Sequence, residues 1–147
     1  MIAFVLSGGG SRGALQVGAL RALLERGVRP DMLVGTSVGG LNAAFVAVEP
    51  SLDRIETLAS LWRTVRRTDI YPDNKLQVAW RLARGHGSLY SNETFYRYIQ
   101  RQYAGVETLS DLKGARCYIV VTNLDTGAMR VMGDRPADKV VDAIMAT

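Results

Sequence analysis

The stretch LVGTSVGGLN, residues 33–42, decides the fold, because it carries the chain from a strand into a helix through a serine flanked by glycines. Gly35 and Gly39 frame Ser37 in the pattern G-x-S-x-G, a sharp strand-to-helix turn that lifts a serine hydroxyl clear of the backbone. Five residues are a weak signal alone, and the same pattern suits a turn serine that caps the following helix. The surrounding sequence has to decide between a nucleophile and a cap.

Strands and helices alternate on both sides of this turn. Ile2–Leu6 is a short apolar run, as expected of a buried strand, and Ala14–Arg26 has apolar residues at helical spacing. Met32–Val34 is a second short strand, and Val38–Val48 is a second helix rich in Ala, Val and Leu. This βαβα order predicts a parallel sheet.

The later sequence continues the alternation. Further helices are expected at Leu52–Arg66, Lys75–Ala83, Asn92–Gln102 and Lys139–Met145, and strands at residues 117–123 and Met129–Met132. No repeat, low-complexity stretch or linker interrupts the chain, so we predict one domain over residues 1–147. The expected fold is α/β, with three layers: a mainly parallel sheet and helices on both of its faces.

Composition limits the functional classes. Of the 147 residues, 48% are apolar and 22% charged, which is enough to bury a core, and the net charge of +4 is too modest to indicate nucleic acid. Cys117 is the only cysteine and suits a buried thiol in a reducing compartment. The apolar start MIAFVL is too short to cross a bilayer. We therefore expect a cytoplasmic protein whose membrane contact, if any, is peripheral.

The first loop is a second glycine-rich turn between strand and helix. Its residues are Gly8, Gly9, Gly10, Ser11, Arg12 and Gly13. They fit the dinucleotide pattern G-x-G-x-x-G, but the acidic residue that should end the second strand is absent, since Gly35 and Thr36 stand there. The loop also suits an oxyanion, because glycines leave backbone N–H groups accessible and the positive end of the helix dipole adds to them.

The two loops are expected to meet. Both follow the carboxyl ends of strands, and in a parallel sheet those ends lie at one edge, where ligands bind. A loop of N–H donors beside an exposed serine is the arrangement that acyl transfer requires, because the donors stabilise the negative oxygen of the tetrahedral intermediate. This geometry favours a nucleophilic Ser37.

The motifs GGGSRG and GTSVGGLNA, in this order, resemble those of the patatin-like phospholipase family. The resemblance implies a hydrolase of acyl esters in phospholipids or related lipids, without a metal or an organic cofactor. It makes Ser37 the nucleophile and residues Gly8 to Gly13 the oxyanion hole. The nucleophile elbow around Ser37 would comprise Gly35, Thr36, Val38 and Gly39.

The same resemblance implies a second catalytic residue, an aspartate, that this sequence does not contain in the expected motif. Members of the family pair the serine with an aspartate in a D-G-G or D-G-A turn, and this sequence contains no Asp-Gly dipeptide. Its late aspartates are expected in turns or on helix surfaces: Asp125, Asp134, Asp138 and Asp142. The single histidine, His86, is expected to be a loop residue without a catalytic role. We therefore expect the chain to be an N-terminal portion that ends before its general base.

Two functional alternatives and the roles of two residues stay open from the sequence. The chain could be a catalytically silent lipid-binding or regulatory module on the same scaffold, or a nucleotide-binding unit using the first loop. Arg12 suits either an ion-paired loop anchor or a site of headgroup attraction. Asn42 suits either an amide on a helix face or, as the resemblance suggests, a support for the elbow.

Overall fold

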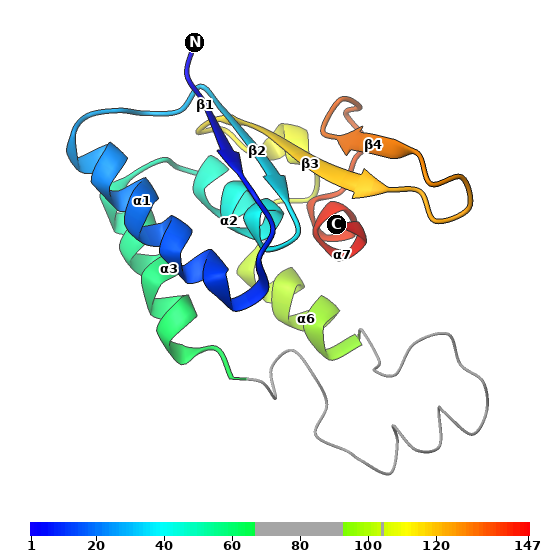
Figure 1. Ribbon diagram of the computed structural model, residues 1–147, viewed down its shortest axis with the longest axis horizontal. Coiled ribbons are helices and arrows are strands. Elements are labelled where there is room, and N and C mark those ends of the chain that lie inside the picture. Colours follow the sequence, from blue (N-terminus) through cyan, green and yellow to red (C-terminus); the bar gives the residue numbers. More distant parts are fainter. Residues whose placement is uncertain (67–92, 104) are drawn as a thin grey trace.

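Four strands form one open mixed sheet in the order β1-β2-β3-β4 (Figure 1). The computed structural model describes residues 1–66, 93–103 and 105–147. The strands are β1 (Ala3–Leu6), β2 (Met32–Thr36), β3 (Arg116–Thr122) and β4 (Met129–Met132). The first three are parallel neighbours, and β4 returns antiparallel along β3. The α/β class and the mainly parallel sheet are confirmed.

The helices follow the expected order. They are α1 (Gly13–Glu25), α2 (Val38–Ala47), α3 (Leu52–Thr64), α6 (Glu93–Gln102) and α7 (Val140–Ala146). Short 3₁₀ turns at Gly10–Arg12 and Leu109–Asp111 were not expected from the sequence. The expected helix at Lys75–Ala83 lies outside the described residues.

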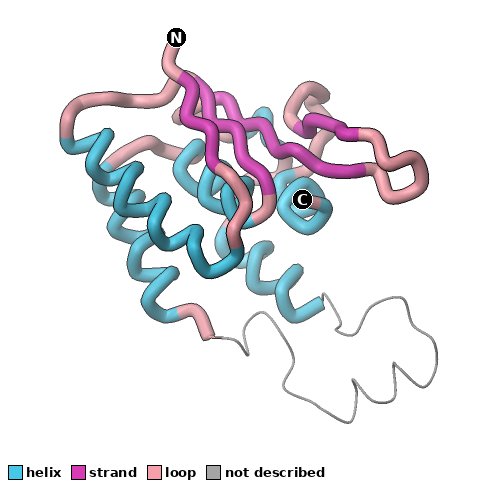
Figure 2. Tube along the Cα trace, in the orientation of Figure 1, coloured by secondary structure: helices cyan, strands magenta, loops and turns pink. Residues whose placement is uncertain are grey.

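The described helices pack against one face of the sheet (Figure 2). Phe4 and Leu33 are neighbours on that face and are buried, whereas Val5 points the other way and is 75% exposed. The topology explains this arrangement, because strands added in one direction with right-handed crossovers place their connecting helices on the same side. Helices were expected on both faces, and those of the described residues cover one.

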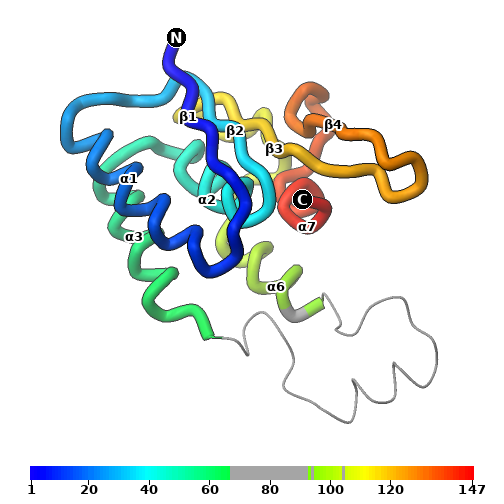
Figure 3. The backbone as a smooth tube through the Cα atoms, in the orientation of Figure 1, coloured from blue at the N-terminus to red at the C-terminus, as the bar shows by residue number. Residues whose placement is uncertain are grey.

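Helix α2 forms the centre of the core. Ala43 to Ala47 are all buried, and α2 contacts the three parallel strands as well as α1, α3 and α7. A helix that is apolar on every side is stable only when it is enclosed, so α2 lies between the sheet and the outer helices (Figure 3). The first residues of α2 therefore have little freedom to move.

The turn after β4 holds a buried carboxylate. Asp138 lies in a turn, one of the two expected locations, but it is buried: it is 6% exposed, pairs with Arg130 at 2.6 Å and accepts a hydrogen bond from the Gly133 amide at 2.8 Å. Burial opposes ionisation, but these hydrogen bonds and the arginine outweigh it and lower the pKa of Asp138. The carboxylate thus anchors the turn that leads into α7.

Two further features concern the core and the membrane. Cys117 is a buried free thiol, and burial raises its pKa to about 12, so it stays protonated at neutral pH. Among the described helices, none combines the length and apolar character needed to cross a bilayer.

Candidate active site

Ser37 occupies a strained position at the point where β2 becomes α2. Its φ of 54° and ψ of −131° make it the one described residue other than glycine with a positive φ. The side chain is exposed and makes no capping hydrogen bond to the helix that it precedes. A serine selected as a cap would use its hydroxyl on the free amides of the first turn, so the geometry does not support that role.

The two glycines of the motif provide room for this turn. A Cβ on Gly35 would overlap the backbone of Gly39, and a Cβ on Gly39 would overlap the carbonyl group of Leu6 at the end of β1. The start of α2 therefore packs directly against the ends of two strands. Neither position can accept a side chain unless the elbow moves.

The first glycine loop lies beside the serine. A Cβ built on Gly8 would stand 3.2 Å from the Cβ of Ser37, and Gly10 and Ser11 line the same cavity as Ser37. Among the described residues, no hydrogen-bond acceptor engages the N–H group of Gly9 or Gly10. These amides, next to the N-terminus of α1, are available to an anion.

Gly13 and Arg12 of the first loop, and Thr36 of the elbow, are not among the residues that line the cavity. Gly13 is buried where an added Cβ would meet Val38 and Trp62, so it sets the distance between α1 and its neighbours. Arg12 is exposed and forms no ion pair with any described residue, which disfavours its interpretation as an ion-paired anchor. Thr36 is exposed at the end of β2.

Asn42 joins the two loops, a role that sequence reasoning left open. It is fully buried, and its Nδ2 donates to the Gly13 carbonyl at 3.0 Å and to Gln16 Oε1 at 2.9 Å. Its Oδ1 accepts from the indole N–H of Trp62 at 3.0 Å. The available signal was a single amide within the apolar run VGGLNAAFVA, since a buried amide has to find partners.

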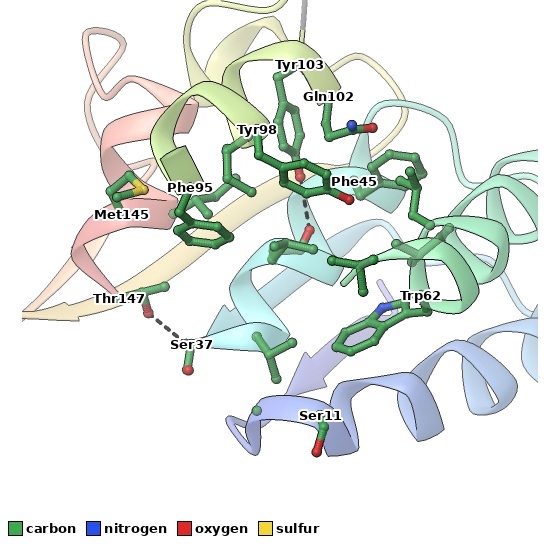
Figure 4. A pocket seen from close by; sticks show the side chains of 18 of the residues that line it. Ser11, Ser37, Phe45, Trp62, Phe95, Tyr98, Gln102, Tyr103, Met145 and Thr147 are labelled. Carbon is green, nitrogen blue, oxygen red and sulfur yellow. Dashed lines mark hydrogen bonds between the residues drawn. The ribbon is translucent and has the colours of Figure 1, made fainter. Parts of the chain in front are cut away.

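A cavity of about 580 Å³ opens from Ser37 into the layer of helices (Figure 4). Figure 4 shows Ser37 and Thr147 on one side of it and the aromatic rings of Phe45, Tyr98 and Tyr103 on the other. Leu58, Leu61 and Ile144 add aliphatic walls. Its size and apolar lining are those of a site for a hydrophobic ligand.

The cavity holds little charge. Its described lining includes Arg66 but no Asp, Glu or His, and His86 lies outside the described residues. Tyr103 is buried in the wall and donates from its hydroxyl to the Leu41 carbonyl at 3.0 Å. Burial raises its pKa above the usual value, so it stays neutral. Among the described residues that line the cavity, no carboxylate or imidazole is present to take the proton of Ser37.

The sequence of this chain matches a family of known proteins. The family model described as patatin-like phospholipase matches residues 4–147. The chain is 33% identical over 144 residues to human patatin-like phospholipase domain-containing protein 6, covering 98% of this chain and 10% of that protein. It is 31% identical over 134 residues to the putative patatin-like phospholipase domain-containing protein M110.7 of Caenorhabditis elegans, covering 88% and 11%.

A further sequence relative and a solved structure also match the chain. Lysophospholipase nte1 of Aspergillus terreus is 41% identical over 70 residues, covering 42% of this chain and 5% of that protein. A chain in the crystal structure of full-length SpcU with full-length ExoU from Pseudomonas aeruginosa superimposes with a TM-score of 0.66. That match covers 99% of this chain and 38% of the other at 17% identity, so it shows the fold alone. The chain spans about a tenth of the length of the first curated relatives that it matches.

Proposed function

The chain belongs to the patatin-like phospholipase family, and we propose that it is the part of a lipid acyl hydrolase that carries the serine nucleophile and the acyl-chain cavity. One observation carries the proposal: the exposed hydroxyl of a strained Ser37 stands at one end of an apolar cavity, beside amides that have no acceptor among the described residues. No metal or organic cofactor is part of the proposal.

The proposed reaction begins at the serine oxygen. Ser37 Oγ attacks the ester carbonyl while its proton passes to a base, and the carbonyl oxygen becomes an oxyanion. The free amides of Gly9 and Gly10 stabilise that oxyanion, and a single such donor is worth about 3 kcal/mol of barrier in comparable sites. The ester C–O bond then breaks, the leaving alcohol takes the proton, and water later releases the fatty acid from Ser37.

The base is proposed to lie beyond this sequence. Among the described residues, no carboxylate or imidazole lines the cavity, and a serine hydroxyl reacts slowly until a group takes its proton. We propose an aspartate from another part of the protein in this role, forming a Ser–Asp dyad. The 147-residue chain alone is then expected to be almost inactive.

The proposed substrate class is an ester with one long acyl chain. The cavity is enclosed mainly by aliphatic and aromatic side chains of α2, α3, α6 and α7, which suits one apolar tail and no headgroup. The headgroup would stay at the mouth, near Ser11 and Ser37, in peripheral contact with a membrane or micelle. One relative is itself named a lysophospholipase, in agreement with a single-chain substrate.

A catalytically silent lipid-binding or regulatory module is the second candidate. The absence of an acidic or histidine side chain from the described lining favours it, because such a cavity binds a fatty chain without cleaving an ester. The silent module would have the same scaffold as the proposed hydrolase and would differ from it only in whether a base reaches Ser37.

Fatty-acid release decides between the two candidates. The longest natural form of the protein, its Ser37→Ala variant and the 147-residue chain would be given monoacyl and diacyl phosphatidylcholine in mixed micelles. We expect faster release from the monoacyl lipid, a loss of at least about a thousandfold in Ser37→Ala, and almost none from the short chain. Unchanged hydrolysis by Ser37→Ala would refute the nucleophile, whereas lipid binding without hydrolysis by the longest form would establish the silent module.

A further inference from the structure

Thr147 contacts the proposed nucleophile from the far end of the sequence. It follows α7 directly, and its Oγ1 accepts a hydrogen bond from the Ser37 backbone N–H at 2.8 Å (Figure 4). The same oxygen donates its proton to the carbonyl of Val120 in β3 at 2.5 Å. One hydroxyl therefore links the elbow to the neighbouring strand, using both its donor and its acceptor capacity.

This contact bears on the strain at Ser37. A residue other than glycine in such a backbone conformation costs about 1–3 kcal/mol and persists only where its surroundings enforce it. On the carbonyl side, the amides of Gly40 and Leu41 bond to the Ser37 oxygen at 2.8 and 3.3 Å. On the amide side, Thr147 makes the bond. Both ends of the residue are thus fixed, which determines the direction of its side chain.

The contact also restricts which amides can hold the oxyanion. Because the Ser37 N–H already donates to Thr147, it is not free to donate to a substrate oxygen. The donors then have to come from elsewhere, and the amides of Gly9 and Gly10 are among those in the adjacent loop for which no described residue is an acceptor. With the Ser37 N–H bonded to Thr147, the elbow would present only the nucleophile, and the first loop would bind the negatively charged oxygen of the substrate.

We propose that Thr147 is a positioning residue that holds Ser37 in its reactive conformation through its hydroxyl. The proposal rests on the proposed function, because it concerns the same nucleophile. It differs from a packing role, in which the methyl group would matter: Cγ2 of Thr147 lies 3.3 Å from where a Cβ on Gly40 would stand.

Two substitutions separate the hydroxyl from the methyl group. Thr147→Val keeps the shape and removes both hydrogen bonds, whereas Thr147→Ser keeps the hydroxyl and removes the methyl. In the longest natural form of the protein, we expect Thr147→Val to lower kcat and the rate of fluorophosphonate labelling about 10- to 100-fold, with KM within about twofold. Thr147→Ser should stay within about threefold of the parent protein on each measure.

The matched control is Thr57→Val. Thr57 is exposed on α3, and among the described residues its hydroxyl bonds only to the Asp53 carbonyl of the same helix, so its loss should leave labelling unchanged. Labelling of Thr147→Val at the parental rate would overturn the proposal. So would a Ser variant as slow as the Val variant, because that pattern indicates packing.

Amide hydrogen exchange tests the contact independently of activity. In the parent chain the Ser37 amide should be protected, and in folded Thr147→Val its exchange should accelerate at least about tenfold, while neighbouring core amides keep their rates. Thr147→Ala is the second variant without the hydroxyl, to be used if the Val variant does not fold. Unchanged exchange at Ser37 would overturn the proposal. A parent protein that neither labels nor hydrolyses would refute the proposed function while leaving this test in force.

Discussion

The molecule contains two glycine-rich turns between strand and helix, and their glycines serve different physical purposes. In the elbow, Gly35 and Gly39 are needed for space, because an added Cβ would overlap backbone atoms. In the first loop, a Cβ on Gly10 would meet no atom within 4 Å, yet its φ is 56° and no described residue accepts its N–H. Glycine thus fixes the elbow by close packing and leaves the first loop open.

The difference shows how one sheet edge can hold both halves of a reaction site. The proposed nucleophile needs a fixed direction, which dense packing around Ser37 provides. The proposed oxyanion needs donors without partners, which a loop facing open space provides. Substitutions that act on one turn and spare the other can test this division.

The largest effect is expected in the packed elbow. Gly39→Ala places a methyl group against the Leu6 and Ser7 carbonyls, so the free energy of unfolding should fall by at least about 3 kcal/mol, measured by urea denaturation. The matched control is Gly18→Ala in α1, where an added Cβ meets nothing within 4 Å. There alanine should stabilise the chain by about 0.5–1 kcal/mol. Equal effects of the two variants would refute the space argument.

A smaller effect is expected where the two turns are joined. Asn42→Leu leaves the Gly13 carbonyl and the Trp62 indole N–H without their partner, so the free energy of unfolding should fall by about 2–3 kcal/mol. Trp62→Phe removes the donor to Asn42 Oδ1 and part of the ring, and should cost about 1 kcal/mol for the lost bond. If Trp62→Phe proved as damaging as Asn42→Leu by the same denaturation experiment, the contacts to α1 would not be what joins the two loops.

The smallest effect on stability is expected in the open loop. Gly10→Ala should lower the free energy of unfolding by about 1–2 kcal/mol, because alanine resists a left-handed φ. Gly27→Ala is its match: its φ is 73°, an added Cβ meets nothing within 4 Å, and it follows α1 at the end away from the loop. The two should cost the same stability, but only Gly10→Ala should slow fluorophosphonate labelling, by at least about tenfold, because alanine disfavours the φ of 56° that aims the amides of the loop at the oxyanion. Equal slowing would remove the loop from the reaction.

Most of the fold could be predicted from local sequence. The apolar runs and the glycines after them place β1, α1, β2 and α2 to within a residue or two, because periodicity and turn chemistry act over short distances. The single covered face of the sheet depends on the order of its strands, which local patterns do not encode.

The supports of the candidate site could not be predicted in the same way. Thr147 bonds to Ser37 across 110 residues, and Asn42 bonds to Gly13 across 29. Both contacts exist only once the chain has folded, and neither residue belongs to the G-x-S-x-G pattern. The burial of Asp138 was not predicted for the same reason, since it depends on Arg130 and on the turn at Gly133.

The most direct test of the central claim is covalent labelling of Ser37. An alkyl fluorophosphonate would be applied to the longest natural form of the protein and to the 147-residue chain, each with its Ser37→Ala variant, and read by intact mass. We predict one adduct on the long form, lost in Ser37→Ala, and little or none on the short chain. An adduct that persists in Ser37→Ala, or a long form that never reacts, would contradict the assignment of Ser37 as a nucleophile.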